Sequence, residues 1–321
     1  MHKTLFIALT LGAIFSAAKP AHNKPPCSKT KSETHSSTST SPPSSSTNSL
    51  ATDSFWKPSV GQSWQIVLSG VVNTKVDLVP NVDIFDIDGQ SHSQQDIAAL
   101  HSKGKKVICY FSAGTVEEGR PDVGSIEQYT GKVLPAWPKE KWVDVRVQAV
   151  RDVMANRIAD FATKGCDALD PDNVDAYNND NGLNNFQKDD SIDYIKWLST
   201  EAAKHNIHIG LKNAGEIIPS VIDSVAFSVN EECNQINECQ VWEAFPNAGK
   251  PVFNVEYIDG GDNGSSRRDV GPVRRVDWKR DGGPVGQCPG TNGFSSVVKK
   301  LSLDGWVRFC DETEETTALV N

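Results

Sequence analysis

Carboxylates recur at the ends of short apolar runs in this chain. Four such segments read IFDID at 84–88, ALDPDN at 168–173, SVNEE at 228–232 and FNVEY at 253–257. Two carboxyl groups on opposite sides of a glycosidic bond can hydrolyse it, because one protonates the leaving oxygen while the other, ionised, meets the cation that develops on the sugar. The residue types therefore indicate sugar hydrolysis by paired acids, provided that the fold brings these distant segments together.

Eight apolar runs are candidates for the strands that would do this. They span 64–69, 82–88, 106–112, 166–173, 208–213, 225–232, 251–257 and 305–310. Segments with helical periodicity separate several of them, most clearly at 94–103, 147–164 and 192–205. Alternating strands and helices are typical of a parallel barrel, so we predict an α/β fold, a (β/α)8 TIM barrel in a single domain. A doubly wound open sheet is the alternative, since the segment between the first two strands is short.

Polar residues at the C-terminal ends of these runs are candidate site residues, because the catalytic face of a barrel lies there. The ends carry Asp86, Asp88, Tyr110, Ser112, Asp170, Asp172, Lys212, Glu231, Glu232, Glu256 and Arg308. Side chains alternate between the two faces of a strand, and we expect the polar face to point into the barrel mouth. This parity places Asp170 with Asp172. It also puts Glu256 inward and favours Glu232 over Glu231.

The N-terminal part of the chain is expected to lie outside the folded domain. Residues 1–18 combine a basic start, an apolar run and small residues, which predicts a secretory signal peptide. Residues 19–54 are rich in Ser, Thr and Pro, which predicts a disordered linker or O-glycosylated stalk. Residues 55–321 then form the catalytic domain.

The cysteines fit an extracellular protein. Of the seven, Cys27 lies in the linker, and the other six are an even number that favours disulfides in an oxidising compartment. The expected pairs are Cys233 with Cys239 and Cys288 with Cys310, with Cys109 and Cys166 as a weaker third. These last two could equally be small buried apolar groups.

Charge and motifs exclude several classes of partner. The formal net charge of −9 argues against nucleic acid and against an anionic membrane surface. No Gly-rich phosphate loop opens a helix, so we expect no nucleotide cofactor. The acids of 170–175 alternate as in a calcium loop but lack its central Gly and distal Glu, and no His pair has zinc spacing. We expect a monomer without cofactor or metal.

Taken together, the strand-end motifs closely resemble those of glycoside hydrolase family 114, the endo-α-1,4-polygalactosaminidases, which include spherulin-4-like fungal secreted proteins. The motifs are WQ at 64–65, FDID at 85–88, VICYFSAG at 107–114, GCDALDPDNVDAY at 165–177, VNEEC at 229–233 and FNVEY at 253–257. The resemblance covers residues 56–258, and residues 259–290 depart from it as an insertion. It implies a (β/α)8 glycosidase that cleaves α-1,4-linked galactosamine in the galactosaminogalactan of fungal walls and biofilms.

The resemblance also implies a catalytic pair, an aspartate at the end of the fourth strand and a glutamate at the end of the sixth. These match Asp172 and Glu231, with Asp170 and Glu232 as the adjacent alternatives. Asp172 would be the ionised group and Glu231 the proton donor. Lys212, on the strand between them, would lower the pKa of the ionised partner.

The implied substrate suggests what else lines the cleft. Galactosamine carries an ammonium group near neutral pH, so acids around the cleft would concentrate its polymer. The expected acids are Asp86, Asp88, Glu117, Glu232 and Glu256, the other polar contacts are Tyr110, Asp170, Asn173 and Lys212, and the aromatic platforms are Trp64, Tyr110, Trp142, Tyr177 and Tyr257. The alternative function is a barrel that binds amino-sugar polymer or wall glycan without cutting it.

Overall fold

The computed structural model of this protein describes residues 55–258 and 293–320. The predicted signal peptide and linker, and the predicted insertion at 259–290, lie outside these ranges. Within them, no helix is long and apolar enough to cross a membrane.

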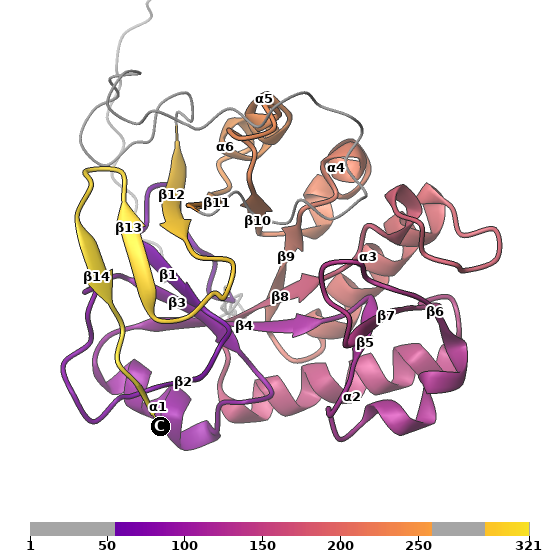
Figure 1. Ribbon diagram of the computed structural model, residues 1–321, viewed down its shortest axis with the longest axis horizontal. Helices are drawn as coiled ribbons and strands as arrows, with labels where there is room; N and C mark the ends of the chain where they lie inside the picture. Colours follow the sequence, from indigo (N-terminus) through magenta and orange to yellow (C-terminus); the bar gives the residue numbers. More distant parts are fainter. Residues whose placement is uncertain (1–54, 259–292, 321) are drawn as a thin grey trace, which may run out of the picture. The chain divides into compact units, whose positions relative to one another are not determined.

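A curled sheet of ten strands organises the domain (Figure 1). In spatial order the strands are β1 (Trp64–Val67), β3 (Ile84–Asp88), β4 (Lys106–Ser112), β8 (Ala168–Asp172), β9 (His208–Lys212), β10 (Phe227–Glu231), β11 (Val252–Tyr257), β12 (Phe294–Lys299), β13 (Trp306–Phe309) and β14 (Glu314–Thr316). The strands from β1 to β12 pair in parallel, and β13 and β14 continue the sheet in antiparallel. Because the parallel strands follow each other in sequence order, their C-terminal ends meet on one side.

The predicted strands agree with the observed ones up to the seventh, but the eighth is wrong. The segment 305–310 contains β13, which runs antiparallel to its neighbour, and the eighth parallel strand is β12. The sequence of β12, FSSVVK, has two serines that shorten its apolar run, whereas WVRF in β13 reads as a better strand on its own. Pairing with β11, and not apolar content, decides which segment is the eighth parallel strand.

Three long helices pack outside the sheet, as the periodicity predicted. They are α1 (Gln94–Ser102), α2 (Gln148–Lys164) and α3 (Lys188–Ala203). A capping box formed by Ser93 and Asp96 begins α1, and α2 ends at Gly165, whose φ of 97° is open to glycine without steric cost. Shorter helical segments are η1 (Val123–Ser125), η2 (Glu127–Tyr129), η3 (Ala176–Asn178), η4 (Gly215–Ile217), α4 (Ile218–Val221), η5 (Ile222–Ser224), α5 (Cys239–Trp242) and α6 (Ala244–Asn247).

A small antiparallel sheet interrupts the connection between β4 and α2. Its strands, in spatial order, are β5 (Thr115–Glu117), β7 (Glu140–Val143) and β6 (Thr130–Val133). Because β5 follows β4 after a turn, this sheet stands beyond the C-terminal end of β4 (Figure 1). A separate antiparallel pair, β2 (Val71–Val72) with β15 (Leu319–Val320), ties the last described residues to the loop after β1.

Two apolar clusters hold the sheet from its two sides. The larger one packs the outer face against the helices and includes Phe85, Val107, Phe161, Leu169 and Leu198. The smaller one fills the concave side and includes Trp64, Ile66, Ile84, Ile108, Ala168, Phe227, Val229, Phe253, Val255 and Val297. The concave side is therefore largely apolar below the strand ends.

Two of the expected disulfides are present in the described part of the chain. Cys109 in β4 is bonded to Cys166, 57 residues away, and Cys233 is bonded to Cys239 within the segment after β10. The pair that the sequence favoured least is thus confirmed. Cys310 is also disulfide-bonded, and Cys288, its expected partner, lies outside the described residues.

Candidate active site

A cavity of about 1000 Å³ opens at the C-terminal ends of the parallel strands. The strands contribute Asp88, Tyr110, Asp172, Lys212, Glu231 and Tyr257. The small sheet and its turns add Glu117, Arg120, Trp137, Glu140 and Trp142. The loops and short helices that follow the strands add Asn173, Asp175, Tyr177, Asn213, Glu232 and Trp242. Segments that lie far apart in sequence therefore converge on one site.

Lys212 lies between the two predicted catalytic carboxylates. Its Nζ is 3.4 Å from Asp172 Oδ2 and 3.9 Å from Glu231 Oε2. Its side chain is 1% exposed. Burial alone would lower the pKa of Lys212, but the charges of Asp172 and Glu231 outweigh it and raise that pKa. A buried ammonium thus holds an acid from β8 and an acid from β10 at the same place on the cavity floor.

Glu231 is held by neighbours on two strands. Its carboxylate accepts a hydrogen bond from Asn213 Nδ2 at 2.9 Å and another from the Tyr257 hydroxyl. Its backbone N–H donates to Asn213 Oδ1 at 3.0 Å. Burial, and then the charge of Glu231, raises the pKa of Tyr257, so this phenol keeps its proton and remains a donor.

The parity argument for Glu232 is wrong. In β10, Phe227 and Val229 belong to the concave apolar cluster, and alternation makes Glu231 the next residue on that face. The following residue, Glu232, has left the strand with a φ of 61°. Parity favoured Glu232 because the polar face of the strand was taken as the inward face, whereas on β10 the inner face is apolar until Glu231.

Asp86 and Asp170 lie beneath the floor and do not line the cavity, contrary to the prediction. Both are fully buried, and their carboxylate oxygens accept no hydrogen bond from a donor in the described part of the chain. Burial, reinforced by neighbouring carboxylates, raises the pKa of Asp170 to about 7 and raises that of Asp86 well above its usual range. Each lies two residues before the last residue of its strand, on the same face of the strand but deeper in the fold. These buried acids therefore lie under the cavity floor and cannot contact sugar.

Glu256 and Trp64 also fail as substrate contacts. The carboxylate of Glu256 accepts hydrogen bonds from the backbone N–H groups of Asn234 and Gln235, at 3.0 and 3.3 Å, and so anchors the loop after β10. Trp64 is 1% exposed within the concave apolar cluster, and its Nε1 donates to the carbonyl oxygen of Ser295 at 2.8 Å. Both side chains are structural.

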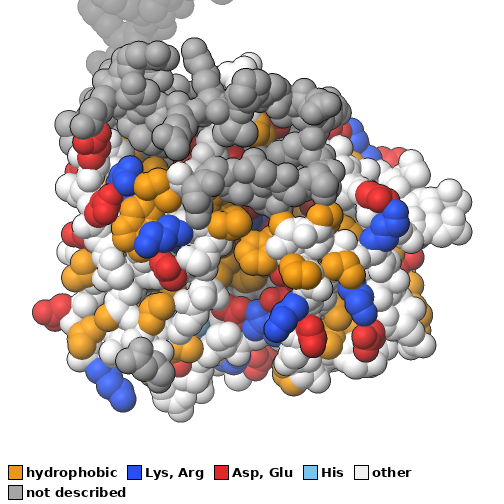
Figure 2. All heavy atoms as spheres, viewed as in Figure 1, with side chains coloured by type: hydrophobic (Ala, Val, Ile, Leu, Met, Phe, Trp, Pro, Cys, Tyr) orange, Lys and Arg blue, Asp and Glu red, His pale blue; other side chains and the backbone are white. Residues whose placement is uncertain are grey.

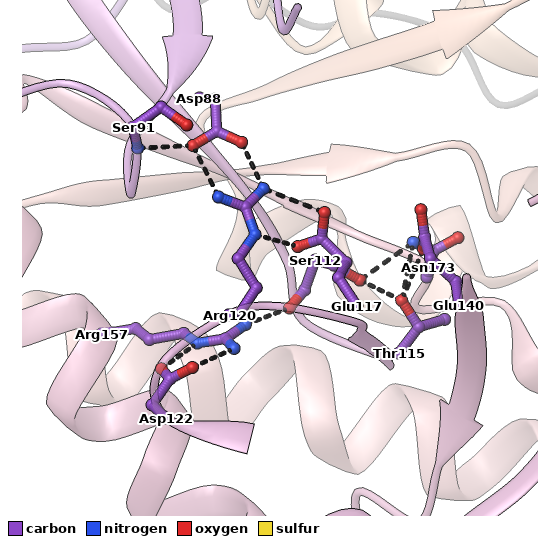
Figure 3. A network of polar contacts seen from close by, with 10 residues as sticks. All are labelled: Asp88, Ser91, Ser112, Thr115, Glu117, Arg120, Asp122, Glu140, Arg157 and Asn173. Atoms are coloured by element: carbon purple, nitrogen blue, oxygen red, sulfur yellow. Dashed lines mark hydrogen bonds and ion pairs between the residues drawn. The ribbon is translucent and has the colours of Figure 1, made fainter. Parts of the chain in front are cut away.

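Arg120 pairs with two of the acids that were expected to attract substrate, and its charge offsets one of their two negative charges (Figure 3). Its guanidinium binds both oxygens of Asp88, and it binds both oxygens of Glu117 at 2.9 and 3.0 Å. Although burial alone would raise it, the pKa of Asp88 is lowered by its hydrogen bonds and ion pair with Arg120. Figure 2 likewise shows acidic and basic side chains next to one another on the displayed face. The sequence analysis did not anticipate Arg120.

A chain of hydrogen bonds leads from Asn173, just after β8, through two hydroxyl groups to Glu140, a residue that was not predicted from the sequence (Figure 3). Asn173 Nδ2 is 3.1 Å from Ser112 Oγ, Ser112 Oγ contacts Thr115 Oγ1, and Thr115 Oγ1 donates to Glu140 Oε2 at 2.8 Å. Burial raises the pKa of Glu140 to about 7. Its segment, EKWV, carried no signal of its own, because Glu140 starts a strand of the small sheet and does not end a strand of the main one.

Aromatic residues line several sides of the cavity. The predicted platforms Tyr110, Trp142, Tyr177 and Tyr257 are among them, with Trp137 and Trp242 in addition. Arg308, by contrast, pairs with Glu314 on β14 and does not line the cavity.

One group of potential metal ligands occurs in the described ranges, Cys233, Cys239 and Glu256. The two cysteines are joined in a disulfide, and Glu256 is occupied by backbone donors. This group therefore has no free thiolate with which to bind an ion.

Comparison with known proteins agrees with this arrangement. The sequence profile of glycoside-hydrolase family GH114 matches residues 45–315. The structure of Aspergillus fumigatus Ega3 in complex with galactosamine is 41% identical, with a TM-score of 0.71, and the match covers 81% of this chain and 99% of that chain. The glycoside hydrolase domain of PelA from Pseudomonas aeruginosa shares the fold at 13% identity and a TM-score of 0.55, over 75% of this chain and 96% of that chain. No curated protein matches this chain.

The family profile spans most of the chain. The sequence required that acids lie at strand ends and that the fold bring them together, and the structure meets both requirements. The match to Ega3 extends over nearly all of that protein. The chain belongs to glycoside hydrolase family 114 and is a glycoside hydrolase.

Proposed function

We propose that this protein is a secreted endo-α-1,4-polygalactosaminidase, which hydrolyses the α-1,4 linkages of galactosaminogalactan, a cationic polysaccharide, with Asp172 and Glu231 as its catalytic carboxyls. The proposal rests on one observation above all. These two acids, from β8 and β10, share the buried ammonium of Lys212 on the floor of the cavity.

Asp172 suits the role of the ionised partner. It is the acid nearest to the Lys212 ammonium on the cavity side, and its Oδ1 accepts a hydrogen bond from the backbone N–H of Asn173 at 2.7 Å. A carboxylate in this position would meet the positive charge that develops at the anomeric carbon.

Glu231 suits the role of proton donor. Its proton would pass to the glycosidic oxygen as the bond from that oxygen to the anomeric carbon breaks. The donors Asn213 and Tyr257 would then stabilise the carboxylate that remains. Water supplies the new hydroxyl group. Its proton returns to Glu231 if Asp172 has bonded to the sugar, or passes to Asp172 if water attacks directly.

The size of the cavity and the relative bound to an amino sugar favour a galactosamine polymer as substrate. Ligand pockets usually measure roughly 300–1,000 Å³, so a cavity of about 1000 Å³ has room for more than one sugar. Ega3 was crystallised with galactosamine. Chain segments held along such a cavity would be cut internally, which is endo action.

The proposal extends to the architecture and the cellular location. We expect the parallel strands to form a closed (β/α)8 barrel, since the Trp64 indole reaches the carbonyl of Ser295 and the Leu68 N–H donates to the carbonyl of Leu303 across the gap between β1 and the later strands. Residues 1–18 would be a signal peptide and 19–54 a linker. The disulfides favour an oxidising, extracellular location.

The deciding experiment is incubation of the purified protein with fungal galactosaminogalactan, followed by mass spectrometry of the released sugars. A ladder of galactosamine oligomers is expected, and re-acetylation of the polymer should slow its release. A protein that binds the polymer without releasing any oligomer would be the non-catalytic alternative, and the proposed activity would be wrong.

A further inference from the structure

Glu140 is a carboxyl group on the cavity wall that the proposed hydrolysis does not use. It is the first residue of β7, the central strand of the small sheet, and it is partly exposed and lines the cavity. Figure 3 shows it beside Thr115 and Asn173, on the far side of Glu117 from Asp88. Its position on the substrate side of the catalytic floor raises the question of what it binds.

The hydrogen bonds of the chain that ends at Glu140 can run in only one donor-to-acceptor order. Each hydroxyl group has a single proton. Thr115 donates its proton to Glu140 Oε2, so Thr115 must accept from Ser112, which in turn accepts from the amide nitrogen of Asn173. The chain therefore delivers a donor to Oε2 and fixes the carboxyl group in place. The other oxygen, Oε1, accepts no hydrogen bond from residues in the described ranges and is left for a ligand.

Glu140 also lacks the cation that the neighbouring acids have. Arg120 pairs with Asp88 and Glu117, and Lys212 serves the acids of the floor. No lysine, arginine or histidine of the described chain forms an ion pair with Glu140. Among the other cavity acids of these ranges, Asp175 and Glu238 also form no ion pair. The carboxylate of Asp175 accepts a hydrogen bond from Asn179 Nδ2, and Glu238 is an exposed residue in the segment after β10.

We propose that Glu140 is the residue of this site that recognises the free amine of the substrate: the ammonium group of a 2-amino-2-deoxyhexose pairs with Oε1 while Thr115 holds Oε2. The proposal deepens the proposed function and rests on it for the identity of the sugar. An N-acetylated sugar has no ammonium group, and its acetamide would leave the carboxylate without a cation. Glu140 thus contributes specificity for the deacetylated sugar.

Proton release should accompany this recognition. Burial, and then the charges of Glu117 and Asp172, raises the pKa of Glu140 to about 7, with Arg120 acting in the opposite direction. Tyr110 also faces it but stays neutral, because burial and nearby acids raise its pKa. An arriving ammonium group favours the carboxylate, so below about pH 7 binding must expel a proton. KM for the amino sugar should therefore fall as the pH rises towards about 7.

The test compares Glu140→Gln with Glu127→Gln. Gln keeps an acceptor for Thr115, so the wall should fold unchanged. Glu127 is a matched control, because it belongs to the same connection between β4 and α2 as Glu140, pairs with Lys141 and does not line the cavity. On deacetylated α-1,4-galactosamine oligomers, Glu140→Gln should raise KM by about 10- to 100-fold, which corresponds to the free energy of one hydrogen bond to a charged group. Because Glu140 does not act on the reacting bond, kcat should change by less than about twofold.

Calorimetry on the unmodified enzyme provides a readout that needs no variant. Galactosamine hydrochloride is titrated at about pH 6, below the pKa of Glu140 of about 7, in two buffers that differ in ionisation enthalpy. In wild type and in Glu127→Gln, the binding heats in the two buffers should differ by an amount that corresponds to the release of up to one proton. In Glu140→Gln, the heats in the two buffers should be the same. N-acetylgalactosamine is the neutral control and should release no proton in any variant.

The outcomes separate this inference from the proposed activity. Unchanged KM in Glu140→Gln, a loss confined to kcat, or galactosamine binding without proton release in wild type would each overturn the role of Glu140 even if the enzyme cuts the polymer. An enzyme that fails to cut the polymer, yet releases a Glu140-dependent proton on binding galactosamine, would retain the amine site and refute the activity.

Discussion

Two clusters of charged side chains lie at the cavity, and they differ in how many acids each cation contacts. The floor cluster is Lys212 with Asp170, Asp172 and Glu231, and the rim cluster is Arg120 with Asp88 and Glu117. Lys212 stands 3.4 to 3.9 Å from three carboxylates. Arg120 makes paired hydrogen bonds to two.

The consequences for protonation are opposite in the two clusters. On the rim, the pKa of Asp88 is lowered by Arg120, so this acid is ionised and its charge is cancelled. On the floor, one ammonium cannot balance the surrounding acids, and burial raises the pKa of Asp170 to about 7. The comparison shows that the number of acids in a cleft does not measure its negative charge. The ratio of cations to acids is a better measure, because one cation faces three acids on the floor and two on the rim. We therefore expect the floor to be reactive and the rim to be structural.

The largest expected effect tests the floor directly. Asp172→Asn should lower turnover of the galactosamine polymer by about 10³-fold or more, because it removes the charge that meets the developing cation. Thermal melting and galactosamine binding should stay close to wild type. The matched control is Asp189→Asn, which changes an exposed acid on α3 and should have no effect on turnover. Full activity in Asp172→Asn, with a loss in Asp170→Asn, would transfer the role to the deeper aspartate.

The second effect separates the two acids of the floor. Glu231→Ala should lose about 10²- to 10⁴-fold on the natural polymer, the usual contribution of a general acid. It should regain much of that rate on an aryl galactosaminide whose leaving group needs no proton. Added azide should react in one of the two variants, and the configuration of the azide product reports which role was removed. Equal losses on both substrates would argue against Glu231 as the acid.

A smaller effect is expected on the rim. Arg120→Gln leaves Asp88 and Glu117 facing each other without a cation, so the free energy of unfolding should fall by about 1 to 3 kcal/mol. Turnover at saturating substrate should fall by less than about tenfold, since the rim holds the wall and takes no part in bond cleavage. Urea unfolding and steady-state kinetics measure the two quantities. A collapse of kcat with unchanged stability would reverse the distinction between rim and floor.

The smallest effect concerns pH. The folded-state pKa of Asp170 is raised to about 7 from an ordinary value of 3.8, so the native state holds a proton that the unfolded chain releases at lower pH. Its contribution to stability is complete below about pH 4 and is lost as the pH rises through about 7. Asp170→Asn should therefore gain stability relative to wild type over this interval. Parallel unfolding free energies from about pH 4 to 8 would show that Asp170 is ionised throughout.

Most of the strands, and the two cavity acids that we propose as the catalytic pair, could be predicted because they depend on local patterns. The alternation of apolar runs with helical segments located seven strands, which are β1, β3, β4, β8, β9, β10 and β11. Acids at the ends of two of them marked Asp172 and Glu231, which both line the cavity. Both features follow from rules that act within a few residues, the period of each element and the position of the barrel mouth. The Cys233–Cys239 pair was also within local reach, only six residues apart in sequence.

The sequence by itself therefore determined which residue types could catalyse and which segments would carry them. Only the tertiary structure decided which acids face the cavity, because each strand's depth and register bury Asp86 and Asp170 while exposing Asp172. It also decided the charge of the site, since Arg120 and Glu140 come from the connection between β4 and α2, whose small sheet the sequence pattern did not predict. Ion pairs and burial are properties of neighbours in space, and the segments that supply these neighbours lie far apart in the chain.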